Sequence, residues 1–104
     1  MNGSMLDVEV LVVPDCPNQA GAERLMRKAL DAAGLPDVPV RTRVVESEEE
    51  AAGLAFTGSP SFRVNGRDPF PSHDVPSLAC RLYRTETGLA GLPDPAGMVD
   101  AVQR

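Results

Sequence analysis

The stretch that decides the fold is VEVLVVPDCPNQAGAERLMRKAL, residues 8–30. It opens with a nearly continuous apolar run rich in valine, which favours a buried central strand over residues 5–13. A proline ends that run. Apolar residues then recur at steps of three and four from Ala22 to Ala33, which predicts an amphipathic helix. We therefore expect a strand, a short turn that carries Cys16, and a helix packed on the strand.

The turn places a cysteine next to the expected start of the helix. Pro17 suits the first helical position, where a missing N–H costs nothing, so Cys16 is expected at or near the N-cap. Backbone N–H groups at a helix start stabilise a thiolate, the form that attacks disulfides and binds soft metals. Asp15 opposes this through its like charge. The alternative is an inert, buried cysteine, because cysteine is among the residues most often buried.

The next part of the chain indicates another strand and helix, followed by a hairpin. Residues 38–45 alternate valine with arginine and predict a strand. Ser47 and Glu50 have capping-box spacing, which predicts a short helix over residues 48–55. The Asn-Gly pair at residues 65–66 predicts a tight turn between two further strands.

The last helix is expected to begin at Asp94-Pro95 and to turn Val99 and Val102 inward. Together these signals predict an α/β fold with the order β-α-β-α-β-β-α and a central mixed sheet. The first two strands should be parallel, and an irregular segment at residues 71–93 should precede the last helix. We expect residues 1–104 to form a single domain.

Bulk composition limits the classes of function. The formal net charge of −5 argues against a nucleic-acid surface, which needs clustered lysine and arginine. No apolar stretch approaches the ~20 residues of a membrane helix, so no membrane partner is expected. The N-terminus lacks the features of a signal peptide, which favours a cytoplasmic protein. Two cysteines are too few for a disulfide-rich secreted scaffold and point to redox or metal chemistry.

The expected order of elements resembles that of the thioredoxin-like fold superfamily. Two motifs strengthen the resemblance: Cys16 at the junction of strand and helix, and Gly58-Ser59-Pro60 before the third strand. The ending CRLYRTETGLAGLP, residues 80–93, is similar to small bacterial thioredoxin-like proteins, some of which carry an alkylmercury-lyase name. The chain departs from the redox family at one position, because Gln19 stands where the second cysteine of the pair would be.

The resemblance implies a thioredoxin-like domain with a substrate site around Cys16. It implies a cis bond between Ser59 and Pro60, with the Ser59 backbone free to pair with an extended substrate segment. Pro60 and Pro17 would then help to shape the substrate groove. Otherwise Pro60 would be a trans proline at the start of an edge strand.

Cys80 is the candidate replacement for the absent cysteine at position 19. A fourth strand running back beside the third would end near Phe70, at the same end of the sheet as Cys16. Cys80 follows about ten residues later, a reach of at most ~35 Å. A bridge to Cys16 would close a loop of about 65 residues and contribute on the order of 4 kcal/mol in the chain-entropy model. The alternative is a Cys80 that packs as a small apolar side chain.

Four other side chains are weaker candidates for a role in the site. Arg63, Arg81 and Arg84 would stabilise a thiolate or an acidic substrate group, or else remain solvated surface charges. His73, the single histidine, lies in a proline-rich loop and is a candidate base or ligand. The cysteines lack the spacing of a structural zinc site, so no metal is expected. If there is a metal, Cys16 and Cys80 would hold a soft ion such as Cu(I) or Hg(II).

Three functions follow from these residues. We favour a thiol–disulfide oxidoreductase in which Cys16 attacks, Cys80 resolves, and the partner is a protein or small-molecule thiol or disulfide, without a cofactor. The second is a non-catalytic binding module on the same fold. The third is handling of a soft metal or an organomercurial by the two thiols, with Asp15 as proton donor. The sequence leaves the oligomeric state open.

Overall fold

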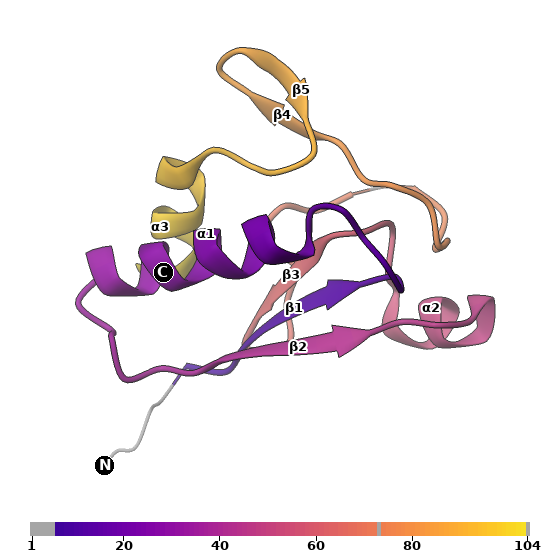
Figure 1. Cartoon of the computed structure of the whole chain (residues 1–104), viewed down its shortest axis with the longest axis horizontal. Helices are drawn as coiled ribbons and strands as arrows, with labels where there is room; N and C mark the ends of the chain where they lie inside the picture. Colours follow the sequence, from indigo (N-terminus) through magenta and orange to yellow (C-terminus); the bar gives the residue numbers. More distant parts are fainter. Residues whose placement is uncertain (1–5, 73, 104) are drawn as a thin grey trace.

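A computed structural model describes residues 6–72 and 74–103 of the chain. Figure 1 shows two helices, α1 (Gln19–Ala32) and α3 (Pro95–Gln103), lying together over one face of a sheet. The main apolar core fills the space between them and the sheet. It contains buried residues of β1 (Val8–Val12), α1 and α3 together with Phe62, which is fully buried. The protein therefore has a mixed α/β architecture, as the sequence predicts.

The sheet has three strands in the order β2-β1-β3. Central β1 pairs in parallel with β2 (Val40–Val44) and antiparallel with β3 (Ser61–Val64), so the predicted mixed sheet is confirmed. Leu11 lies opposite Ser61 in the register of β1 and β3. The end of β1 and the start of β3 therefore lie side by side at the same end of the sheet. The chain leaves β1 at this end and continues to Cys16.

Helix α1 begins at Gln19, two residues later than the Pro17 start expected from the sequence. Two turns take up the residues before it. The backbone N–H of Cys16 donates to Val13 O at 3.3 Å, and that of Gln19 donates to Cys16 O at 3.2 Å. Cys16 therefore lies near the N-cap, as predicted, but two residues before it, because the N-cap is Asn18.

Helix α2 (Glu48–Leu54) forms where the capping pattern predicts it. The Ser47 Oγ accepts a hydrogen bond from the backbone N–H of Glu50 at 3.1 Å. One residue of the helix, Ala51, is fully buried. It belongs to a second, smaller core with Leu11, Val45 and Phe56.

The predicted hairpin after β3 is only half formed. Asn65 and Gly66 make the turn, with φ of 53° and 80°, but only Arg67 pairs back, through a single bridge to Val64. The predicted fourth strand toward Phe70 is therefore wrong. Prolines at positions 69 and 71 have no N–H to donate, so they cannot continue a ladder of hydrogen bonds.

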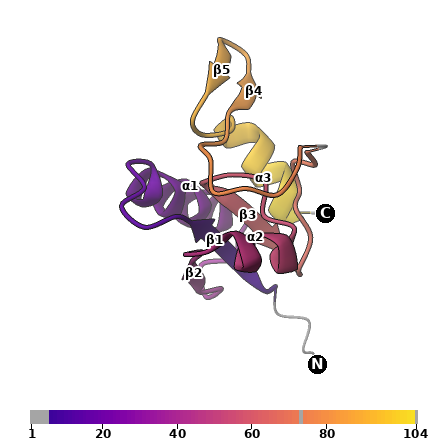
Figure 2. The same cartoon turned by 90° about the vertical axis from the view of Figure 1, so that its right-hand side faces the viewer.

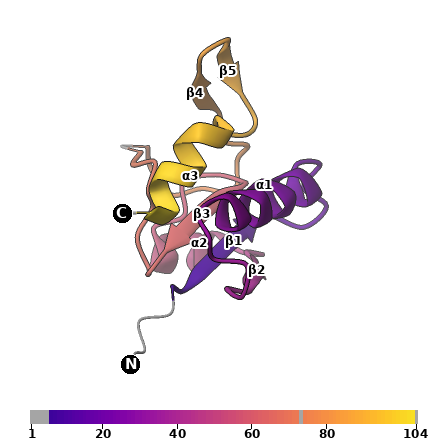
Figure 3. The same ribbon diagram turned by 90° about the vertical axis from the view of Figure 1, so that its left-hand side faces the viewer.

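The segment 71–93, predicted to be irregular, contains a small hairpin. It consists of β4 (Tyr83–Thr85) and β5 (Gly88–Ala90), which pair antiparallel and project away from the sheet (Figures 2 and 3). Gly88 adopts a φ of 114°, and the Thr85 hydroxyl donates to its carbonyl at 2.7 Å. The sequence TETG lacks the Asn-Gly signature of a tight hairpin turn, so the sequence pattern did not predict this hairpin.

Helix α3 starts where predicted, and its Val102 is buried while Val99 packs against the main core. The backbone N–H of Met98 donates to Asp94 O at 3.2 Å. The carboxylate of Asp94 accepts from the backbone N–H of Glu86 at 3.2 Å and so ties the hairpin to the helix. Within residues 6–72 and 74–103, no helix combines the length and the apolar character that a membrane crossing requires.

Candidate functional site

Cys16 lies in the turn between β1 and α1, which we call the Cys16 turn (residues 13–18). Its thiol is free and its side chain is half-buried, packed against the edge of the main core. Asp15 and Pro17 on either side are exposed, and Asp15 adopts a left-handed backbone conformation with φ of 58°. The thiol is therefore supported from below by apolar side chains and flanked by residues that face solvent.

Ser59 connects the Cys16 turn to a distant part of the chain. Its hydroxyl oxygen accepts a hydrogen bond from the backbone N–H of Val13 at 3.0 Å. Its own backbone N–H donates to Ala79 O at 2.9 Å, and its carbonyl accepts from the N–H of Arg81 at 3.0 Å. One buried serine thus holds the base of the Cys16 turn with its side chain and the residues around Cys80 with its backbone.

Cys80 pairs directly with Ser59 through a parallel β-bridge. Its thiol is free and its side chain is exposed. We call residues 77–81 the Cys80 segment; it also pairs with Phe56, whose carbonyl accepts from the N–H of Ser77 at 3.0 Å.

The bridge also fixes the face on which Cys80 lies. Residues that oppose each other in a ladder share a face, and their neighbours point to the other face. Cys80 therefore shares the face of the Ser59 hydroxyl, which is the face bonded to the Cys16 turn. The packing of Gly58 agrees with this assignment, because a Cβ added to Gly58 would lie 2.8 Å from the Cβ of Arg81, on the opposite face.

The bond between Ser59 and Pro60 is cis, as the resemblance implied. Pro60 is buried, and its carbonyl accepts a hydrogen bond from the hydroxyl of Tyr83 at 2.6 Å. Burial raises the pKa of the Tyr83 hydroxyl well above its ordinary value of 10, and the nearby Arg81 guanidinium opposes part of that rise. Pro60 is therefore held by the chain's own tyrosine rather than exposed on a groove.

Two of the three arginines proposed as thiolate partners have other roles. Arg81 is 7% exposed, and its guanidinium donates to Asp68 at 2.7 Å, to the Ser61 hydroxyl at 3.2 Å and to the carbonyl of Phe70. Arg63 also faces Asp68, at 3.6 Å, so the interpretation of both residues as solvated surface charges is wrong.

Arg63 also donates to the carbonyl of Leu54 at 2.7 Å and so caps the end of α2. Of the three arginines only Arg84 is exposed. The role of Asp68 as the shared partner of Arg63 and Arg81 was missed because no recognised sequence motif links these three residues.

No cluster of three or more His, Cys, Asp and Glu side chains able to hold a metal ion occurs within residues 6–72 and 74–103. His73 lies outside the described residues. Cys16 and Cys80 thus remain the two soft donors among the candidates.

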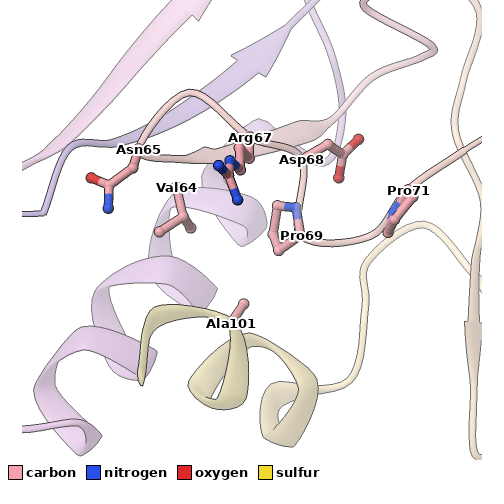
Figure 4. A pocket seen from close by; sticks show the side chains of 7 residues that line it. All are labelled: Val64, Asn65, Arg67, Asp68, Pro69, Pro71 and Ala101. Atoms are coloured by element: carbon pink, nitrogen blue, oxygen red, sulfur yellow. The ribbon is translucent and has the colours of Figure 1, made fainter. Parts of the chain in front are cut away.

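The hollow drawn in Figure 4 does not include either cysteine. It has a volume of about 460 Å³ and is lined by Val64, Asn65, Arg67, Asp68, Pro69, Pro71 and Ala101. Val64 ends β3 and pairs with Val8, at the start of β1. The hollow therefore opens near the end of the sheet where β1 starts, and the Cys16 turn lies at the other end.

Comparison with known proteins adds nothing to this picture. No family model, curated protein or solved structure gives a significant match to the chain. The thioredoxin-like resemblance therefore stays a prediction that depends on the sequence motifs quoted above.

Proposed function

We propose that this protein is a thioredoxin-like thiol–disulfide oxidoreductase in which Cys16 is the attacking thiol and Cys80 the resolving thiol. The observation that carries the proposal is the double role of Ser59. Its hydroxyl bonds the Cys16 turn while its backbone pairs with Cys80, so one residue links the two cysteine-bearing segments.

The proposed reaction transfers two electrons from the two thiols to a disulfide RSSR. The Cys16 thiolate attacks one sulfur, forms a mixed disulfide Cys16–S–S–R and releases RS⁻. The Cys80 thiolate then attacks the Cys16 sulfur, forms an internal disulfide and releases the second RS⁻. The two protons lost by the cysteines complete two RSH, and an added thiol reductant restores the starting state.

The burial of the two cysteines fits this division of roles. Cys16 is half-buried against the core, which limits approach to its thiol, whereas Cys80 is exposed and open to an incoming mixed disulfide. A disulfide needs Cα atoms within ~7 Å, so the internal disulfide requires that Cys16 and Cys80 come within that distance.

The test treats the reduced protein with oxidised glutathione and follows its mass with and without alkylation. We expect the wild type to lose two hydrogens and two alkylation sites. Cys80→Ser should accumulate a glutathione adduct on Cys16, and Cys16→Ser should react far more slowly. Two alkylatable thiols in the wild type after this treatment would rule out the proposal and leave the non-catalytic binding module and the soft-metal candidate below.

The second candidate is binding of a soft metal ion or an organomercurial by the same two thiols. The exposed Asp15 beside Cys16 favours it, because a carboxyl group there would supply the proton for cleavage of a carbon–mercury bond. We would measure Hg(II) and Cu(I) binding by the reduced protein and its single serine variants. Stoichiometric binding that needs both cysteines would support this candidate, and its absence would remove it.

A further inference from the structure

The thioredoxin-like resemblance implies that the backbone of Ser59 is the edge on which an extended substrate chain would pair, and the chain's own residues already occupy this edge. We propose that the Cys80 segment is a built-in occupant of this edge, so that the protein reduces small disulfides and discriminates against extended protein substrates. This inference rests on the oxidoreductase proposed above and names its class of substrate.

Recognition of an extended peptide by strand addition requires unpaired N–H and C=O groups on the receiving strand. At Ser59 both groups are used, the N–H by Ala79 O at 2.9 Å and the carbonyl by the N–H of Arg81 at 3.0 Å. An incoming chain would have to break both bonds before it could form its own. Cys80 stands between these two bonds, at the position where a cysteine of a paired substrate would stand.

Side chains on either side of Ser59 hold the segment in place. We call Asp68, Arg81 and Tyr83 the clamp. The Arg81 guanidinium donates to Asp68 at 2.7 Å and lies 4.5 Å from the centre of the Tyr83 ring. The Tyr83 hydroxyl donates to Pro60 O at 2.6 Å, directly after Ser59 in the chain.

Displacing the segment would expose a buried ion pair and a buried hydroxyl, each of which costs free energy when it loses its partner.

The contact at Gly58 leaves no space for a second chain between the two segments. A Cβ at this position would lie 2.8 Å from the Cβ of Arg81 and 3.2 Å from Ala79 O. The glycine is thus the feature that lets the two backbones approach. The outer side of the segment stays open, since Ala79 and Cys80 are exposed. A small disulfide can therefore approach the segment from this side without disturbing the pairing.

The first measurement compares how fast the reduced protein reduces oxidised glutathione and insulin disulfides under identical conditions. Because an insulin disulfide is carried on a peptide chain that the paired Cys80 segment keeps out of register with Cys16, whereas oxidised glutathione needs no such pairing, we expect the insulin rate to be lower by about a hundredfold. Equal rates would overturn the inference while leaving the oxidoreductase intact. No reaction of Cys16 with either disulfide would overturn the oxidoreductase itself.

The second measurement loosens the clamp with Tyr83→Phe, and Arg84→Ala is the matched control because Arg84 is exposed beside it. We expect the ratio of the insulin rate to the glutathione rate to rise at least severalfold in Tyr83→Phe and to stay at the wild-type value in Arg84→Ala. An unchanged ratio in Tyr83→Phe would count against the built-in occupant.

The third measurement needs no chemistry at the cysteines. Hydrogen exchange should show the amides of Ser59 and Arg81 protected in the wild type and faster in Tyr83→Phe. Wild-type exchange as fast as that of the exposed Val75 would show that the edge is open and would refute the inference.

Discussion

The two cysteines sit in regions held together by different forces. The Cys16 turn continues directly from β1 into α1, and both elements bury apolar side chains such as Val10 and Leu30 completely. The Cys80 segment contributes little to either core and is held by backbone bonds to Ser59 and by Arg81 at its end. The difference indicates that Cys16 is held in place by the global stability of the domain, whereas Cys80 is held by a local polar network.

The largest expected effect is that of Leu30→Ala in the apolar region. Leu30 is fully buried on α1 in the main core, and truncation of such a side chain costs about 4 kcal/mol of unfolding free energy. We expect hydrogen exchange to become faster throughout the domain, because the loss affects global unfolding. Leu89→Ala is the control, since Leu89 is 65% exposed and should change stability by less than about 0.5 kcal/mol.

Arg81→Ala should cause the next largest loss of unfolding free energy, and it should speed hydrogen exchange in a different part of the chain. It removes the buried donor to Asp68 and Ser61, and we expect a loss of about 2–3 kcal/mol. Exchange should become faster first in residues 77–85 while β1 keeps most of its protection. A uniform loss of protection across the domain would mean that the two regions are not separable.

The sequence predicted the apolar region well because its signals are local. Three- and four-residue spacing defined α1, and the serine cap at Ser47 defined α2 where the structure has them. It failed at residues 67–90, where the structure depends on contacts between residues far apart in the chain. No local pattern reveals that Asp68 will pair with Arg81, whereas Pro69 and Pro71 already argue against the strand expected after Arg67.

The candidate site was predictable to the same extent. The position of Cys16 near a helix start and the cis bond before Pro60 were expected from motifs. The pairing of Cys80 with Ser59 was not, because the expected path to Cys80 ran through a fourth strand that does not form. The burial of its neighbour Arg81 was also not predicted, because arginine is rarely buried unless it has a partner and the sequence did not show that partner.

Tyr83→Phe is expected to cost about 1 kcal/mol, the net contribution of one buried hydrogen bond, because the Pro60 carbonyl loses its donor. The same hydroxyl predicts a pH dependence in the wild type. Its pKa is raised in the folded state, so its contribution to stability is complete below pH 10 and is lost as the pH rises above that value. The free energy of unfolding should therefore fall above pH 10.

Chemical denaturation of the two proteins at increasing pH measures this fall, which should be smaller in Tyr83→Phe. The tyrosinate absorbance of the wild type gives an independent check. Tyr83 is the only tyrosine and the chain has no tryptophan, so the signal reports this one hydroxyl. A tyrosine that ionises near pH 10 in the folded protein would contradict the buried bond to Pro60.

The smallest expected effects on the free energy of unfolding come from substitutions at the end of α2, and both should increase stability. Gly53 is exposed inside the helix with nothing within 4 Å of an added Cβ, so Gly53→Ala should add about 0.5–1 kcal/mol of stability. Ala55 follows the helix in the left-handed conformation, with φ of 53°, where glycine is preferred.

Ala55→Gly should therefore also stabilise the protein, by up to about 1 kcal/mol.

Thermal or chemical denaturation of the two single variants and the double variant measures these gains. Because α2 packs mainly on the small core around Phe56, these stability gains should not change the ratio of the hydrogen-exchange rate at the Arg81 amide to the rates in β1. If stabilising α2 also slows exchange at Arg81, the bond between Ser77 N–H and Phe56 O transmits stability into the Cys80 segment. The position of Cys80 would then depend on the apolar cores after all, and the separation between the two regions would fail.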